Sequence, residues 1–146
     1  MIGGTRMTNS WILSAFVSMF FAGCTSVIAK KGLEGISGDL GLTVRTCFVF
    51  IFTLLFASCV VPSKEWSLLK TFNWIWLGAS AVTTTLSWIF YYRALKLGDV
   101  ATVALIDKGS VIIAVTLAAI VFHESLSLTK CFGAALIVAG LVVISR

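Results

Sequence analysis

Charged side chains are scarce in this sequence. Of its 146 residues, 12% are Asp, Glu, Lys or Arg and 59% are hydrophobic, and the mean hydropathy is +1.05. A typical soluble domain carries about 25% charged residues. The composition therefore excludes a soluble globular domain and predicts an integral membrane protein.

The charges that are present do not form a nucleic-acid-binding surface. The net charge is +5, but the basic residues stand singly near the ends of apolar runs. This arrangement is typical of anchoring at membrane surfaces. We therefore expect the lipid bilayer as the environment of the chain and no nucleic acid as a partner.

Clusters of reactive or metal-ligating residues are also lacking. The sequence has one histidine, His123, and its four cysteines form no C-x-x-C motif. Without a nucleophile–base pair or a ligand cluster, we expect no enzyme activity, no metal and no cofactor. The four cysteines are predicted to be small, buried, free thiols: Cys24, Cys47, Cys59 and Cys131.

Long apolar runs dominate what remains. Their lengths suit membrane-spanning helices, and they predict an all-α membrane protein with five helices, at about 11–29, 40–61, 73–95, 100–122 and 128–145. No internal repeat or linker interrupts them, so we expect one domain over residues 1–146, with its termini on opposite sides of the membrane. Basic residues only weakly favour an outside N-terminus.

A polar leader, residues 1–10, precedes the first run. Within that run, Phe21-Ala22-Gly23-Cys24 faintly resembles a lipoprotein cleavage motif. The first position of that motif is usually leucine, and four further apolar runs follow, so we expect no cleavage.

The fourth run carries two charges well inside it. Asp107 and Lys108 lie about 10 Å from the Val100 end, and a helix starting after them would be too short to cross. Each charge costs about 2.5–3.5 kcal/mol at the centre of a membrane helix, so both are expected to face the protein interior. Neighbouring helical residues point about 100° apart, which predicts that Lys108 pairs poorly with Asp107. Arg45 enters the second helix about as deeply and is the predicted partner of Asp107, with snorkelling to the surface as its alternative.

Hydroxyl groups recur at helical spacing on the first and third helices. Either a solute pathway or bonding to the backbone and between helices explains them. With the buried charges, they form our predicted substrate pathway: Ser14, Ser18, Thr25, Arg45, Ser80, Thr84, Ser87, Tyr91, Asp107 and Lys108. Gly133 and Gly140, on the fifth helix, predict close helix packing, either within one copy or between two.

Several motifs together resemble the EamA domain of the drug/metabolite transporter superfamily, and most closely its single-domain, five-span members. They are Tyr91-Tyr92-Arg93-Ala94-Leu95-Lys96-Leu97-Gly98-Asp99, Ile106-Asp107-Lys108, His123-Glu124-Ser125-Leu126-Ser127, Ala29-Lys30-Lys31-Gly32 and Arg45-Thr46. Leu105 departs from a proline frequent in the family, which puts a proline kink in doubt, and Gly109 can supply flexibility instead. The first helix lacks the carboxylate of the smaller multidrug members, which argues against their proton-coupled mechanism.

The resemblance implies one half of a ten-helix, inverted-repeat transporter. A small-molecule substrate, alternating access, a homodimer and a bacterial inner-membrane location follow as expectations. Either an oppositely inserted copy of the chain or a related half could complete the transporter. The alternative is a non-transporting membrane protein that assists the assembly of another complex. The sequence does not indicate the substrate, the coupling ion or the direction of transport.

Overall fold

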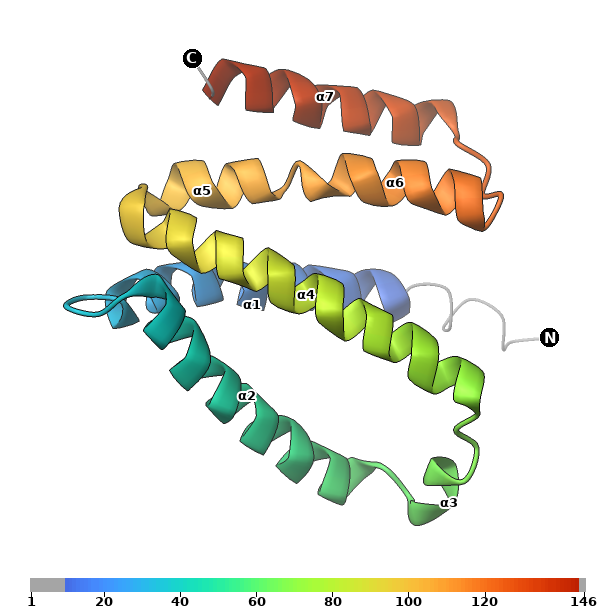
Figure 1. Cartoon of the computed structure of the whole chain (residues 1–146). Coiled ribbons are helices and arrows are strands. Elements are labelled where there is room, and N and C mark those ends of the chain that lie inside the picture. The colour runs from blue at the N-terminus through green and yellow to red at the C-terminus, as the bar shows by residue number, and fades with distance from the viewer. Residues whose placement is uncertain (1–9, 145–146) are drawn as a thin grey trace. The chain divides into compact units, whose positions relative to one another are not determined.

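The structure is a computed structural model that describes residues 10–144. The described residues form helices and no strands. The helices are α1 (Ser10–Gly32), α2 (Gly38–Val60), α3 (Ser63–Trp66), α4 (Thr71–Leu97), α5 (Val100–Asp107), α6 (Ser110–Val121) and α7 (Leu128–Ile144) (Figure 1). The predicted all-α class is confirmed. The polar leader up to Asn9, and Ser145 at the predicted end of the fifth helix, lie outside the described residues.

The boundaries of the longer helices follow the apolar runs closely, except in the fourth run. The run at residues 100–122 was predicted as one continuous helix, but the structure divides it into α5 and α6 at Lys108 and Gly109. The backbone N–H groups there bond to carbonyls three residues back instead of four: Lys108 to Leu105 at 3.1 Å and Gly109 to Ile106 at 2.9 Å. Such 3₁₀-type bonds tighten the turn and interrupt the α-helix.

Membrane-spanning length and apolarity are found in three places among the described helices: α1, α2 and the α5–α6 stretch Val100–Val121. The 27 residues of α4 are long enough, but its threonines and serines make it less apolar. The 17 residues of α7 extend about 25 Å, at the short end of the range for a span. Integral membrane character is therefore supported directly, whereas a count of five spans is not.

Very little of the described chain is shielded from its surroundings. The buried hydrophobic residues are Leu33, Leu42, Tyr92 and Leu95. Long apolar side chains elsewhere, such as those of Phe50 and Leu77, are more than 60% exposed. Lipid or neighbouring helices can cover such surfaces in a membrane, where the buried apolar core of a soluble protein is not required.

Two compact units make up the structure, and Ala29–Leu97 is one of them. In it, α2 and α4 meet where α2 begins and α4 ends, and they diverge toward α3 (Figure 1). The hydroxyl of Ser37 caps α2 by accepting from the N–H of Leu40 at 3.2 Å. Satisfying an unpaired N–H in this way fixes where the helix starts.

The other unit contains α5, α6 and α7. Here α7 packs against both α5 and α6, so it bridges the interruption between them. The carboxylate of Asp99 caps α5 by accepting from the N–H of Thr102 at 2.9 Å. The unit therefore presents a broken apolar helix held against a second helix.

Candidate functional site

Two lysines connect the end of α1 to the end of α4 by hydrogen bonds that run in both directions. The Nζ atom of Lys30 donates to the carbonyl oxygen of Leu95 at 2.6 Å and to that of Lys96 at 3.3 Å. In return, Nζ of Lys96 donates to the carbonyl oxygen of Leu33 at 2.9 Å. The last carbonyls of a helix have no hydrogen-bond partner within it and carry partial negative charge. Each lysine supplies both a hydrogen-bond donor and a positive charge to these carbonyls.

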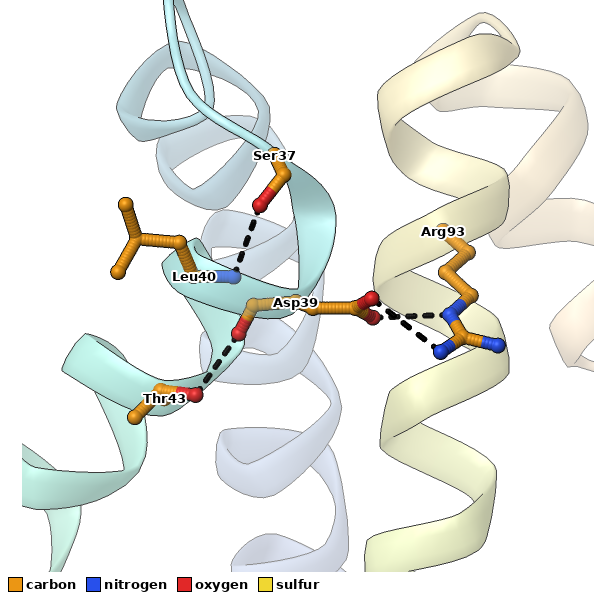
Figure 2. A network of polar contacts seen from close by, with 5 residues as sticks. All are labelled: Ser37, Asp39, Leu40, Thr43 and Arg93. Carbon is orange, nitrogen blue, oxygen red and sulfur yellow. Dashed lines mark hydrogen bonds and ion pairs between the residues drawn. The ribbon is translucent and has the colours of Figure 1, made fainter.

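A second connection joins the start of α2 to the end of α4. Arg93 contacts Asp39 through two bonds, Nε to Oδ1 at 2.8 Å and Nη2 to Oδ2 at 3.2 Å (Figure 2). Both side chains are more than half exposed, so the pair contributes orientation more than stability. Thr43 donates to the backbone carbonyl of Asp39 at 2.8 Å, which adds a local bond in the same turn.

The backbones of α2 and α4 approach closely beside this pair. A Cβ atom on Gly38 would lie 2.8 Å from the carbonyl oxygen of Tyr92, so the contact requires glycine. The side chain of Leu33 packs against Gly41 and is 2% exposed, while Leu95 is fully buried. We call the group of Lys30, Leu33, Asp39, Arg93, Leu95 and Lys96 the terminal clamp.

The terminal clamp accounts for much of the motif at residues 91–99. Arg93, Leu95 and Lys96 each hold another segment of the same unit, and none of them belongs to the predicted substrate pathway. Sequence reasoning missed the role of Asp39, because nothing near it along the chain identifies Arg93 as its partner. The motif is therefore structural at these positions.

Arg45 lies on aromatic rings of α4. Its guanidinium carbon is 4.4 Å from the centre of the Trp88 ring and 5.8 Å from that of Tyr92. Both distances fall within the range of cation–π attraction. The predicted ion pair between Arg45 and Asp107 would join the two units and stays a prediction.

A pocket of about 430 Å³ lies between α2 and α4 in this unit. It is lined by Asp39, Leu42, Thr43, Thr46, Cys47, Thr85, Ile89 and Arg93. None of these belongs to the predicted pathway, although the three threonines lie on the same helices as predicted residues. The sequence did single out one of these lining residues, because Thr46 belongs to the Arg45-Thr46 motif.

The predicted pathway hydroxyls bond within their own helices where their bonds are seen. Ser14 donates to the carbonyl of Ser10 at 2.9 Å, Thr25 to that of Phe21 at 2.8 Å, and Thr84 to that of Ser80 at 2.8 Å. This bonding is usual for hydroxyls in apolar helices, and it leaves their oxygen lone pairs able to accept. A pathway role for Ser14, Ser18, Thr25, Ser80, Thr84, Ser87 and Tyr91 stays a prediction.

The charges at the helix interruption lie closer together than the sequence predicted. Nζ of Lys108 is 3.5 Å from Oδ2 of Asp107, so the expectation that these neighbours pair poorly was wrong. That expectation assumed a regular helix, whereas the chain leaves the α-helix at Lys108. The interruption therefore carries two opposite charges that neutralise each other. We call Asp107, Lys108 and Gly109 together the α5–α6 break.

The glycine of the break and the glycines of α7 differ in how closely other atoms surround them. A Cβ atom on Gly109 would lie 3.0 Å from the Leu141 side chain, so glycine lets α7 pack against the break. Gly133 and Gly140 have nothing within 4 Å of such an atom. Neither glycine therefore makes a close contact within its own unit, and a packing role, either within one copy or between two, stays a prediction.

The cysteines are free thiols, but they are less buried than predicted. Cys24 is half-buried, whereas Cys47, Cys59 and Cys131 are exposed. The helices that carry them are exposed along most of their length, which explains the difference. In the described part of the chain, no group of three His, Cys, Asp or Glu side chains is placed to hold a metal ion.

These features define a multi-pass, all-helical membrane protein with a broken apolar helix. The chain matches the model of the EamA-like transporter family over residues 9–146 and belongs to that family. It is 34% identical over 142 residues to a protein of Sinorhizobium sp described as "Uncharacterized transporter in cobO 3'region", covering 95% of this chain and 99% of that one. No solved structure matches the chain. The resemblance in the sequence is thus confirmed, and the chain is a member of a family of membrane transporters.

Proposed function

We propose that the protein carries a small metabolite or drug-like solute across the bacterial inner membrane by alternating access. The observation that carries the proposal is the α5–α6 break, a charged pair 3.5 Å apart inside an apolar stretch of spanning length. Discontinuous helices with charges are typical of transporter binding sites near the bilayer midplane. The relative named as a transporter is bacterial, which supports the location.

Five spans in one chain supply half of an inverted-repeat transporter. α4 and α7 complete the five spans. The hydroxyls of the proposed pathway make α4 more polar than the other spans. α7 lies at the short end of the spanning range and is expected to cross without tilt. The termini then lie on opposite faces, and two oppositely inserted copies reproduce the inverted pair of halves. Gly133 and Gly140 make no close contact within their own unit, which supports α7 as the helix that packs against the second copy.

Uptake by the purified protein in liposomes tests this function. We expect at least one solute from a panel of radiolabelled amino acids, sugars and cationic drugs to accumulate faster than in protein-free liposomes. Counterflow, in which unlabelled solute inside accelerates entry of labelled solute, should accompany it, since a carrier exchanges solute at one site. Folded protein that moves no member of the panel would favour the alternative, an accessory subunit that does not transport.

A further inference from the structure

Two buried polar groups in the Ala29–Leu97 unit have no hydrogen-bond partner. They are Nη1 of Arg45 and the hydroxyl of Tyr92, and each is shielded within the described structure. Tyr92 as a whole is only 4% exposed. Buried polar atoms are nearly always paired, so two unpaired ones on contacting side chains require an explanation.

The aromatic rings do not supply the hydrogen-bond partners that these two groups lack. The Trp88 ring, 4.4 Å from the guanidinium carbon, attracts the positive charge but gives Nη1 of Arg45 no hydrogen-bond acceptor. Arg45 lies seven residues beyond Gly38, about 10 Å along an apolar helix. At that depth an uncompensated guanidinium is costly, and a negatively charged acceptor would remove the cost.

The carboxylates of the same unit are not available to Arg45. Asp39 is bonded to Arg93, and Glu34 is bonded to Lys31 at 2.8 Å. Glu65 lies in α3, beyond the opposite end of α2 from the terminal clamp. A negatively charged acceptor for Nη1 of Arg45 would therefore have to come from outside this unit.

We propose that Arg45 and Tyr92 form a binding site for an oxyanion, a carboxylate or phosphate group. A guanidinium presents several donors in a planar fork that fits such groups, and the phenol adds a further donor. The inference rests on the proposed function for its biological meaning, since the oxyanion of a transported solute would give the substrate class. A lipid headgroup phosphate presents the same chemistry, and the experiment separates the two sources.

Thermal unfolding of the purified protein in detergent tests the site. We expect benzoate or inorganic phosphate to raise the unfolding temperature of the wild-type protein, and the neutral match benzamide to leave it unchanged. Arg45→Gln should abolish the rise. Lys64→Gln, which removes the same charge from an exposed position in α3, should retain it.

Tyr92→Phe keeps the buried ring and removes only the unpaired hydroxyl. Without added anion, this variant should be as stable as the wild type or more so, because an unsatisfied buried group has been deleted. Its apparent affinity for the anion should fall roughly tenfold, as when a hydrogen bond to a charged group is lost. A tyrosine that acts only through its buried ring would leave the anion response of Tyr92→Phe unchanged, so the two readings separate even if Arg45→Gln fails to fold.

The source of the oxyanion is decided by adding phosphatidylglycerol or the neutral phosphatidylcholine to the same samples. Stabilisation by dissolved anions assigns the site to a solute, whereas Arg45-dependent stabilisation by phosphatidylglycerol alone assigns it to lipid. The proposal is overturned if no anion stabilises the wild type, or if Tyr92→Phe leaves the response unchanged. Binding is measured without transport, so failure of the uptake experiment leaves this result standing.

Discussion

Leu95→Ala should lower the free energy of unfolding by about 2–5 kcal/mol, the usual cost of emptying a fully buried leucine site. Leu95 is 0% exposed, and its carbonyl oxygen accepts the bond from Lys30, so its side chain and backbone both lie in the terminal clamp. A cavity there would loosen the end of α4 from α1 and α2. Unfolding of the purified protein by SDS in mixed micelles measures the change.

Leu97 provides a matched control two residues further along the same helix. It is 89% exposed, so Leu97→Ala should change the free energy of unfolding by less than about 0.5 kcal/mol. Equal effects of the two substitutions would mean that Leu95 is not specially packed and that the terminal clamp does not hold this end of the unit together.

Neutralising one charge of the α5–α6 break should nearly abolish uptake and also impair folding. Asp107→Asn leaves Lys108 unpaired, and Lys108→Gln leaves Asp107 unpaired. An unpaired charge costs about 2.5–3.5 kcal/mol at the centre of a membrane helix. The double variant Asp107→Asn/Lys108→Gln carries no charge there and should fold as well as the wild type. It should still not transport, because the charges that we propose as part of the solute route are gone. Expression, SDS unfolding and liposome uptake on the three variants separate these effects.

An equivalent pair outside the break serves as the control. Nζ of Lys130 lies 3.7 Å from Oε2 of Glu124, and both side chains are about half exposed. Glu124→Gln/Lys130→Gln removes the same two charges and should retain uptake. Wild-type uptake by the Asp107→Asn/Lys108→Gln protein would contradict a functional role for the break.

The helices were largely predictable from sequence because apolar runs of spanning length have few alternatives. The run at 40–61 became α2 at Gly38–Val60, and its start was shifted by the Ser37 cap, a local polar contact that hydropathy does not include. The interruption at Lys108 was not predicted, since no proline marks it. Gly109 was the available signal, but a glycine alone does not specify which turn forms.

The contacts of the terminal clamp could not be predicted from periodicity. Lys30 and Leu95 are 65 residues apart, and Arg93 and Asp39 are 54 apart. Which distant residues meet depends on how the helices pack, and hydropathy carries little of that information. The sequence singled out Arg45 as a charge inside the second helix, but its contacts with the rings of Trp88 and Tyr92 were not predicted, because aromatic residues at helix ends usually mark the membrane interface.

Water access to the α5–α6 break within the membrane tests the central claim most directly. A single cysteine is introduced as Ser110→Cys, next to Gly109, in a protein whose native Cys24, Cys47, Cys59 and Cys131 are replaced by alanine. A charged maleimide that does not cross the bilayer should label it when added from either face, as alternating access requires. Ser125→Cys, in the loop before α7, shows how much of the protein exposes this loop on each face, because oppositely inserted copies would present it on both. A cysteine at position 110 that reacts only after denaturation would contradict a water-accessible break and, with it, the proposed route for the solute.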